Sequence, residues 1–142
     1  MDPSGGLLAT WMIAAMPAID AAVIEDGVFS VMTAFAEHPD WHVLPQLLGG
    51  LPQDPGALSI TRDIDPAAHI DRVEASVLLM TGSTGGFVTT HGTSLMYRML
   101  SLGYKDVQRA AYHVDGGVSA CERQSDRFGR ILDFLRQHVE RP

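Results

Sequence analysis

Residues 1–61 contain no lysine and no arginine, although they carry seven acidic side chains. Residues 62–142 hold ten basic and ten acidic side chains, so the whole net charge of −7 comes from the first part of the chain. Proteins that recognise a nucleic-acid backbone need clustered lysine and arginine. The sequence therefore argues against nucleic acid as a partner.

Cysteine and long apolar runs are also scarce. Cys121 is the only cysteine, which excludes an internal disulfide. No apolar run approaches the roughly 20 residues that span a bilayer, and the first residues lack the basic segment of a signal peptide. We therefore expect a cytoplasmic protein with no membrane partner. With 142 residues, 46% of them hydrophobic, the chain is expected to form one domain over residues 1–142 with a buried core.

Three short apolar runs have the length and composition of buried parallel strands. They are residues 21–25, 75–81 and 107–114. Between and around them lie segments with helical spacing or helix-capping residues: 7–16, 28–37, 66–73 (opened by Asp65), 91–102 and 121–139. Residues 41–57, which contain three prolines and three glycines, are expected to form an irregular, short-helical connection.

The predicted elements alternate between helix and strand along the chain. Strands that are joined through helices form parallel sheets with right-handed crossovers. The sequence thus predicts an α/β fold with a three-stranded parallel sheet flanked by helices. The last helix is expected to pack through five apolar side chains: Phe128, Ile131, Leu132, Leu135 and Val139.

Three stretches, taken together, resemble a known family. Ser4-Gly5-Gly6-Leu7-Leu8 is similar to the end of a nucleophile elbow and its helix, and residues 75–88 are similar to the strand and loop that carry a catalytic acid. Residues 103–117 and the helix after them are similar to a last strand and histidine loop. In this order they resemble the C-terminal half of the α/β-hydrolase domain of the prolyl oligopeptidase family, which includes acylaminoacyl and dipeptidyl peptidases. The resemblance implies a truncated α/β-hydrolase-like half domain.

The resemblance also implies where a catalytic triad would lie. Alignment on the paired glycines of the elbow places the nucleophile at Pro3, with Ser4 one residue late. The acid falls at Gly85 and the histidine at Gly117. None of these three positions carries the side chain that the chemistry needs, and loss of a triad costs a serine hydrolase about a million-fold in rate. We therefore expect no ordinary peptidase activity.

Association is the first interpretation of function. A sheet whose first strand once lay inside a larger sheet leaves N–H and C=O groups unpaired beside apolar side chains. We expect a homodimer, or a partner chain that supplies the missing strands, and so an oligomerising scaffold or a small-molecule-binding protein. Residues 107–114 form the alternative edge.

A ligand site is the second interpretation. Parallel α/β sheets bind ligands beyond the carboxyl ends of their strands. Those ends carry Asp26, Ser83, Thr84, His113 and Asp115. His113 is a side chain that titrates near neutrality, and it lies two residues from Asp115. A repurposed enzyme that uses this pair for acid/base chemistry on a small molecule is therefore the alternative function.

Two other residues have both a chemical and a structural interpretation. Trp41 offers a large surface to a ligand, although core packing is the more common role of tryptophan. Ser4 is the displaced nucleophile of a residual serine hydrolase or peptidase in a third hypothesis. Its place just before an apolar helix is typical of an N-cap, which is the interpretation we favour.

No cofactor and no metal are predicted. His38 and His42 have the spacing of a metal-binding pair on a helix, but Pro39 between them opposes a continuous helix. The glycines of residues 82–86 lack the Gly-Lys-Ser/Thr ending of a phosphate-binding loop. His69 and His138 are expected on helical surfaces without a ligand set.

Overall fold

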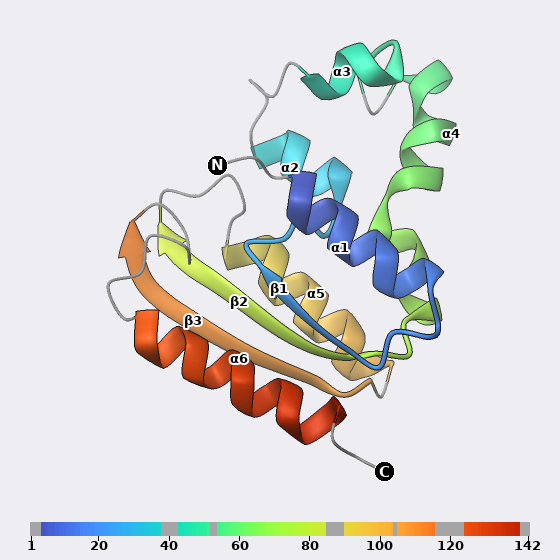
Figure 1. Ribbon diagram of the computed structural model, residues 1–142. Helices are drawn as coiled ribbons and strands as arrows, with labels where there is room; N and C mark the ends of the chain where they lie inside the picture. The colour runs from blue at the N-terminus through green and yellow to red at the C-terminus, as the bar shows by residue number, and fades with distance from the viewer. Residues whose placement is uncertain are drawn as a thin grey trace.

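The computed structural model describes residues 4–37, 43–51, 54–84, 90–103, 105–115 and 124–139. Its strands are β1 (Ala21–Glu25), β2 (Ser76–Thr84) and β3 (Val107–Asp115). Its helices are α1 (Ser4–Ala15), α2 (Val31–Glu37), α3 (Val43–Leu48), α4 (Pro55–Ile64), the 3₁₀ helix η1 (Pro66–Arg72), α5 (Thr90–Leu102) and α6 (Gln124–Val139). Figure 1 shows these helices around one curved sheet. The predicted α/β class is confirmed.

The sheet has the order β1-β2-β3, and both strand pairs are parallel. Residues 77–81 of the central strand are buried without interruption, as expected for a strand that is covered on both faces. All three predicted strands are confirmed, and β1 has the predicted first and last residues. The second and third extend further, to Thr84 and Asp115.

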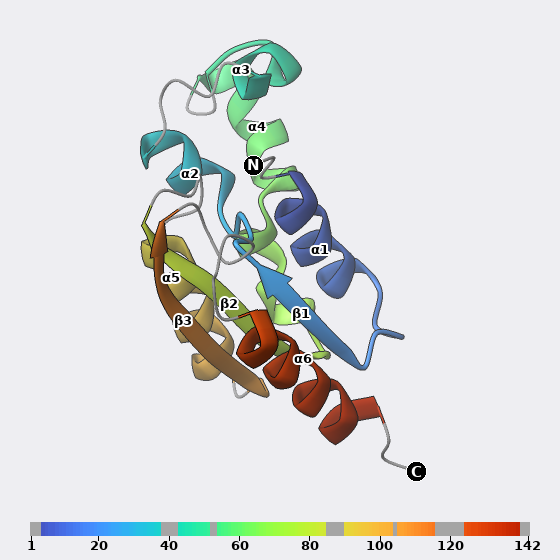
Figure 2. The same cartoon turned by 60° about the vertical axis from the view of Figure 1, so that its left-hand side comes forward.

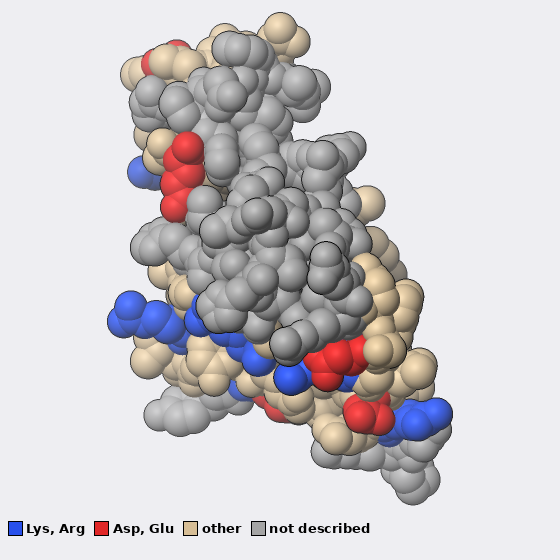
Figure 3. Space-filling model, turned by 90° about the vertical axis from the view of Figure 1, so that its left-hand side faces the viewer, with Lys and Arg blue, Asp and Glu red and all other residues tan. Residues whose placement is uncertain are grey.

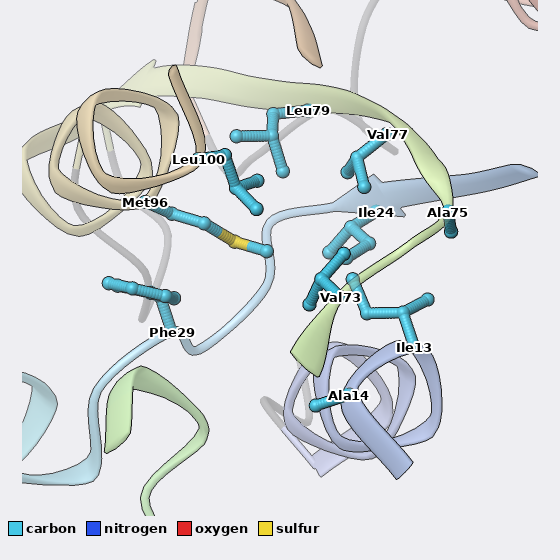
Figure 4. Packing of buried hydrophobic residues seen from close by; sticks show 10 residues of the cluster. All are labelled: Ile13, Ala14, Ile24, Phe29, Val73, Ala75, Val77, Leu79, Met96 and Leu100. Carbon is cyan, nitrogen blue, oxygen red and sulfur yellow. The ribbon is translucent and has the colours of Figure 1, made fainter. Parts of the chain in front are cut away.

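Helices cover both faces of the sheet (Figure 2). α1, η1 and α5 pack on one face, and α6 packs on the other. The larger core lies on the first face and brings together residues of α1, all three strands and α5, including Ile13, Ile24, Leu79, Met96 and Leu100 (Figure 4). In the described part of the chain, no helix combines the length and the apolar character needed to cross a membrane.

The packing face of α6 differs from the predicted one. Phe134, which the prediction omitted, is buried against Leu78 and Met80 of β2. The prediction is wrong for three of its five residues, which are exposed: Phe128, Leu132 and Val139. At 100° per residue, the five predicted side chains and Phe134 together span roughly 160° of the helix surface, and the contact with the sheet is centred on the Phe134 side of this arc.

Two helices depart from the expected bounds because of their caps. α2 begins at Val31 and not at Val28, since the Ser30 hydroxyl accepts a hydrogen bond from the Thr33 N–H over 3.2 Å and so acts as the N-cap. The predicted irregular connection over residues 41–57 contains α3 and the start of α4. Pro55 occupies the first turn of α4, where proline costs no hydrogen bond.

Asp65 joins the beginnings of two helices. As predicted, it opens a short helix, because its side chain accepts a hydrogen bond from the Ala67 N–H over 3.2 Å at the start of η1. The same carboxylate accepts from the Ser30 hydroxyl at 3.0 Å and from the Val31 N–H at 3.3 Å. Asp65 is only 7% exposed. This buried carboxylate therefore ties α2 to η1 across 34 residues of sequence.

Candidate site at the carboxyl ends of the strands

The carboxyl ends of β2 and β3 lie side by side. Thr84 is opposite Asp115 in the register, and the register is irregular just before this pair. The backbone therefore brings Ser83 and Thr84 next to the segment that contains His113 and Asp115. Four of the residues predicted to contact a ligand meet at one end of two neighbouring strands.

Asp26, which we predicted to contact a ligand after β1, forms hydrogen bonds to β2. Its carboxylate accepts a hydrogen bond from the Gly82 N–H over 3.0 Å, and its own N–H donates to the Met80 carbonyl over 2.9 Å. The residue is buried and has a φ of 47°, in the left-handed region where glycine, asparagine and aspartate are found more often than other residues. These contacts bind the end of β1 to β2.

Replacing Asp26 by alanine is expected to lower the free energy of unfolding by about 2 kcal/mol, because a buried N–H loses its acceptor. Urea unfolding followed by circular dichroism measures the effect. Asp26→Asn is the matched control: asparagine keeps one acceptor oxygen and tolerates the left-handed backbone, so we expect most of the stability to be retained. Equal losses in both variants would contradict the role given to the Gly82 contact.

The segment after Asp26 contributes to the core rather than to an open site. Residues 27–31 are all buried. Within it, Phe29 packs in the same cluster as Met96 of α5 and Leu79 of β2, as Figure 4 shows. The carboxyl end of β1 is therefore closed by packed side chains.

An ion pair that the sequence did not indicate holds α6 over the end of β1. The Arg127 Nε donates to Glu25 Oε1 over 2.8 Å, and a second guanidinium N–H donates to Glu25 Oε2. A third N–H reaches the Gln124 side chain at 2.9 Å. The two partners are 102 residues apart in the sequence, so no local sequence pattern predicts the contact. Such bidentate geometry fixes both the position and the direction of a helix.

Several predicted positions lie outside the described residues: Pro3, His38, Trp41, His42, Gly85 and Gly117. The structure therefore neither supports nor opposes the roles given to them. Ser4, which we predicted to be the N-cap, is the first residue of α1 and so lies one position inside the helix.

Two histidines on helices, His69 and His138, pack against aromatic side chains. The side chain of His138 is buried against Phe134, with ring centroids 4.5 Å apart, and its Nδ1 lies 3.5 Å from the Asp106 carboxylate. The predicted surface position is wrong for His138. The ring of His69 lies against Trp11, with centroids 4.9 Å apart. Among the described residues, no three histidine, cysteine or acidic side chains gather to hold a metal.

A hollow of about 150 Å³ lies between β3 and α6. Its lining combines polar and charged side chains with an apolar floor: Leu78, Gln108, Arg109, Ala110, Arg130, Asp133, Phe134 and Gln137. Figure 3 views the side of the molecule on which β3 lies and shows Lys and Arg side chains in a band across its lower half. The hollow is closer to the amino ends of the strands, so it does not coincide with the predicted ligand site.

Solved structures of similar fold are α/β-hydrolases. An acylaminoacyl peptidase in complex with Z-Gly-Gly-Phe-chloromethyl ketone matches with a TM-score of 0.76 at 15% identity, covering 97% of this chain and 23% of that chain. The Pyrococcus horikoshii acylaminoacyl peptidase matches at 0.78 and 18%, covering 94% and 22%. An esterase of Pyrococcus furiosus matches at 0.58 and 12%, covering 94% and 50%.

These likenesses establish the fold, because the identities are too low to carry function. The three-stranded parallel sheet with its flanking helices is α/β-hydrolase-like, as the sequence resemblance implied. The chain spans less than a quarter of the length of the acylaminoacyl peptidases. The sequence matches no protein-family model, and no curated protein is similar enough in sequence to count as a match.

Proposed function

We propose that this chain is a non-hydrolytic domain of α/β-hydrolase-like fold that works as an oligomerising scaffold. The edge of β1 carries the proposal. β1 ends the described sheet, and its apolar residues Ala21, Ala22 and Val23 are only half-buried. A strand edge of this kind, with unpaired backbone groups beside apolar side chains, favours pairing with another chain.

The chemistry of the matched motif positions supports the non-hydrolytic part of the proposal. Proline and glycine stand at the positions of nucleophile, acid and base: Pro3, Gly85 and Gly117. Ser4 lies within α1, and the buried acid after β1, Asp26, accepts a hydrogen bond from the Gly82 N–H. A serine without a base and an orienting acid has little nucleophilic reactivity.

Light scattering on the eluate of a size-exclusion column tests the association. At micromolar concentration we expect a mass of about twice the 15.4 kDa of one chain, or a larger multiple. A single species at the mass of one chain, unchanged on concentration, would remove the scaffold proposal.

A serine-directed fluorophosphonate probe tests the loss of hydrolysis. We expect no stoichiometric labelling of the protein, and no turnover of p-nitrophenyl butyrate above that of buffer, because the activated nucleophile is missing. Labelling that disappears in Ser4→Ala would show instead that Ser4 is a nucleophile and would restore the hydrolase interpretation.

A small-molecule site is the second candidate function, and the strand register is the observation that favours it. The register places Ser83 and Thr84 beside the His113–Asp115 segment, at the end of the sheet where α/β proteins bind ligands. Ester turnover that survives Ser4→Ala but is lost in both His113→Ala and Asp115→Ala would support this candidate. The absence of turnover, or turnover that none of these substitutions changes, would speak against it.

A further inference from the structure

α6 carries two different flanks on either side of its packed face. Arg130, Asp133 and Gln137 line the hollow toward β3. At 100° per residue, Phe128, Leu132 and Val139 fall on the opposite flank, and they are 54%, 51% and 64% exposed. Because α6 packs chiefly on β1 and β2, this apolar flank extends past the edge of β1. We call these three residues the α6 stripe.

α1 carries a second exposed apolar stripe on the other face of the sheet. Leu8 and Met12 of α1 and Met16, directly after its last residue, recur at every fourth residue and are 61%, 42% and 47% exposed. Trp11 of the same helix turns toward η1, where it contacts His69. The three exposed residues, the α1 stripe, therefore lie on the side of α1 that is turned away from η1 and α5. Figure 2 shows α1 beside β1, on the side of the molecule away from β3.

Charge distinguishes the two edges of the sheet. Neither stripe contains a charged residue, and Glu25 at the end of β1 is neutralised by Arg127. The β3 edge carries Arg109, and Arg130 stands near it on α6. Charged side chains on an edge strand oppose the approach of a second strand, above all one with the same charge. Arg130 is itself paired with Asp126, and the exposed Asp20 precedes β1, so the charge of Arg109 on β3 is what favours the β1 edge as the one that a copy of this chain approaches.

From this arrangement we propose that the partner at the β1 edge is a second copy of this chain, related by a two-fold axis perpendicular to the sheet. The inference rests on the proposed scaffold function and names its partner. Such an axis sets the two β1 strands antiparallel, with the α6 stripes facing each other on one face of the sheet and the α1 stripes facing each other on the other. An isologous interface must be self-complementary, and apolar-on-apolar contact in both helical layers meets this requirement.

The buried area is sufficient for a dimer. The six residues of the two stripes leave roughly 600 Å² exposed on each copy, so a pair would bury at most about 1,200 Å² before the β1 backbone is counted. Stable interfaces begin near this size, and their centres are apolar. A net charge of −7 on each copy makes an uncharged contact face still more necessary.

Site-specific cross-linking tests the two-fold arrangement. In a Cys121→Ser background, Leu132→Cys places a single thiol in the middle of the α6 stripe, and Asp133→Cys places it one residue away on the flank of the hollow. With a short bismaleimide, we expect most of the Leu132→Cys protein to form a covalent dimer, and the Asp133→Cys protein to form little. Both positions are exposed, so we expect both variants to fold as the parent chain does.

The dimer dissociation constant of a variant with a charge in the α6 stripe gives the second test. Leu132→Glu is expected to weaken dimerisation about 30-fold or more, whereas Gln137→Glu, on the opposite flank, leaves it unchanged. A multimer that cross-links through Asp133→Cys and not Leu132→Cys would overturn the two-fold inference and leave the scaffold function in place. A monomer in light scattering at every concentration would overturn both.

Discussion

Replacing Phe29 by alanine is expected to lower the free energy of unfolding by about 4 kcal/mol, the usual cost of truncating a buried phenylalanine. Phe29 is 1% exposed and packs in the larger core with buried residues of α1, β1, β2 and α5. Its neighbours Leu79 and Met96 belong to β2 and α5, which are held by their own hydrogen bonds and cannot close the space left by the ring. The lost transfer free energy of the phenyl ring and the free-energy cost of the cavity therefore add.

Urea unfolding at one fixed protein concentration measures the Phe29 effect, since an associating protein gains stability with concentration. Phe35→Ala is the matched control, because Phe35 lies a few residues on but is only partly buried. Its loss is expected to be about half as large. If Phe29→Ala cost less than Phe35→Ala, the segment after β1 would not be the packed element described here.

Replacing Asp65 by alanine is expected to cost about 3 kcal/mol. The carboxylate accepts hydrogen bonds from the Ser30 hydroxyl and from the Val31 and Ala67 N–H groups. Removing it leaves the two N–H groups without their acceptor in a buried place, and each unsatisfied group costs about 1–3 kcal/mol. The same urea titration measures the loss, and the change should appear as a lower midpoint with an unchanged slope.

Asp71→Ala is the control for Asp65→Ala, because Asp71 is an exposed acid on η1, the helix that Asp65 caps. Its effect is expected to stay within about 0.5 kcal/mol, as for other surface substitutions. Asp65→Asn, which keeps one acceptor oxygen, should fall between the two. A loss in Asp71→Ala as large as that in Asp65→Ala would show that the carboxylate of Asp65 is not the link between α2 and η1.

The strands could be predicted because the signal is local. Residues 21–25 form a short apolar run that ends at Asp26-Gly27, and residues 77–81 are apolar up to a threonine, as both faces of a central parallel strand require. The cap at Asp65 could be predicted for the same reason, since an acid followed by proline acts on the next turn alone.

Helix α4 and the packing face of α6 were not predicted correctly for different reasons. The prolines and glycines near Pro55 signal a break, and they conceal a helix whose stability comes from Ala57 packing beneath α2 and α3. In α6, the apolar residues occupy a wide arc, and only the position of the sheet decides that Phe134 faces inward while Phe128 and Leu132 face outward.

At the candidate site, the sequence placed Ser83, Thr84, His113 and Asp115 at strand ends, and the parallel register brings them together. It did not indicate that Asp26 is engaged by Gly82, or that Glu25 is paired with Arg127. Both contacts join segments that are far apart along the chain. Sequence patterns relate residues within one element, so they do not predict contacts between residues so far apart in the sequence.

By itself, the sequence determined the three parallel strands, the α/β class and the uneven charge, because each follows from neighbouring residues or from composition. Only the tertiary structure decided which side chains at the strand ends are engaged in holding the sheet, and which apolar side chains of α1 and α6 stay exposed. These features depend on how helices lie across the sheet. That arrangement is set by the burial of apolar surface over the whole molecule, which no local pattern records.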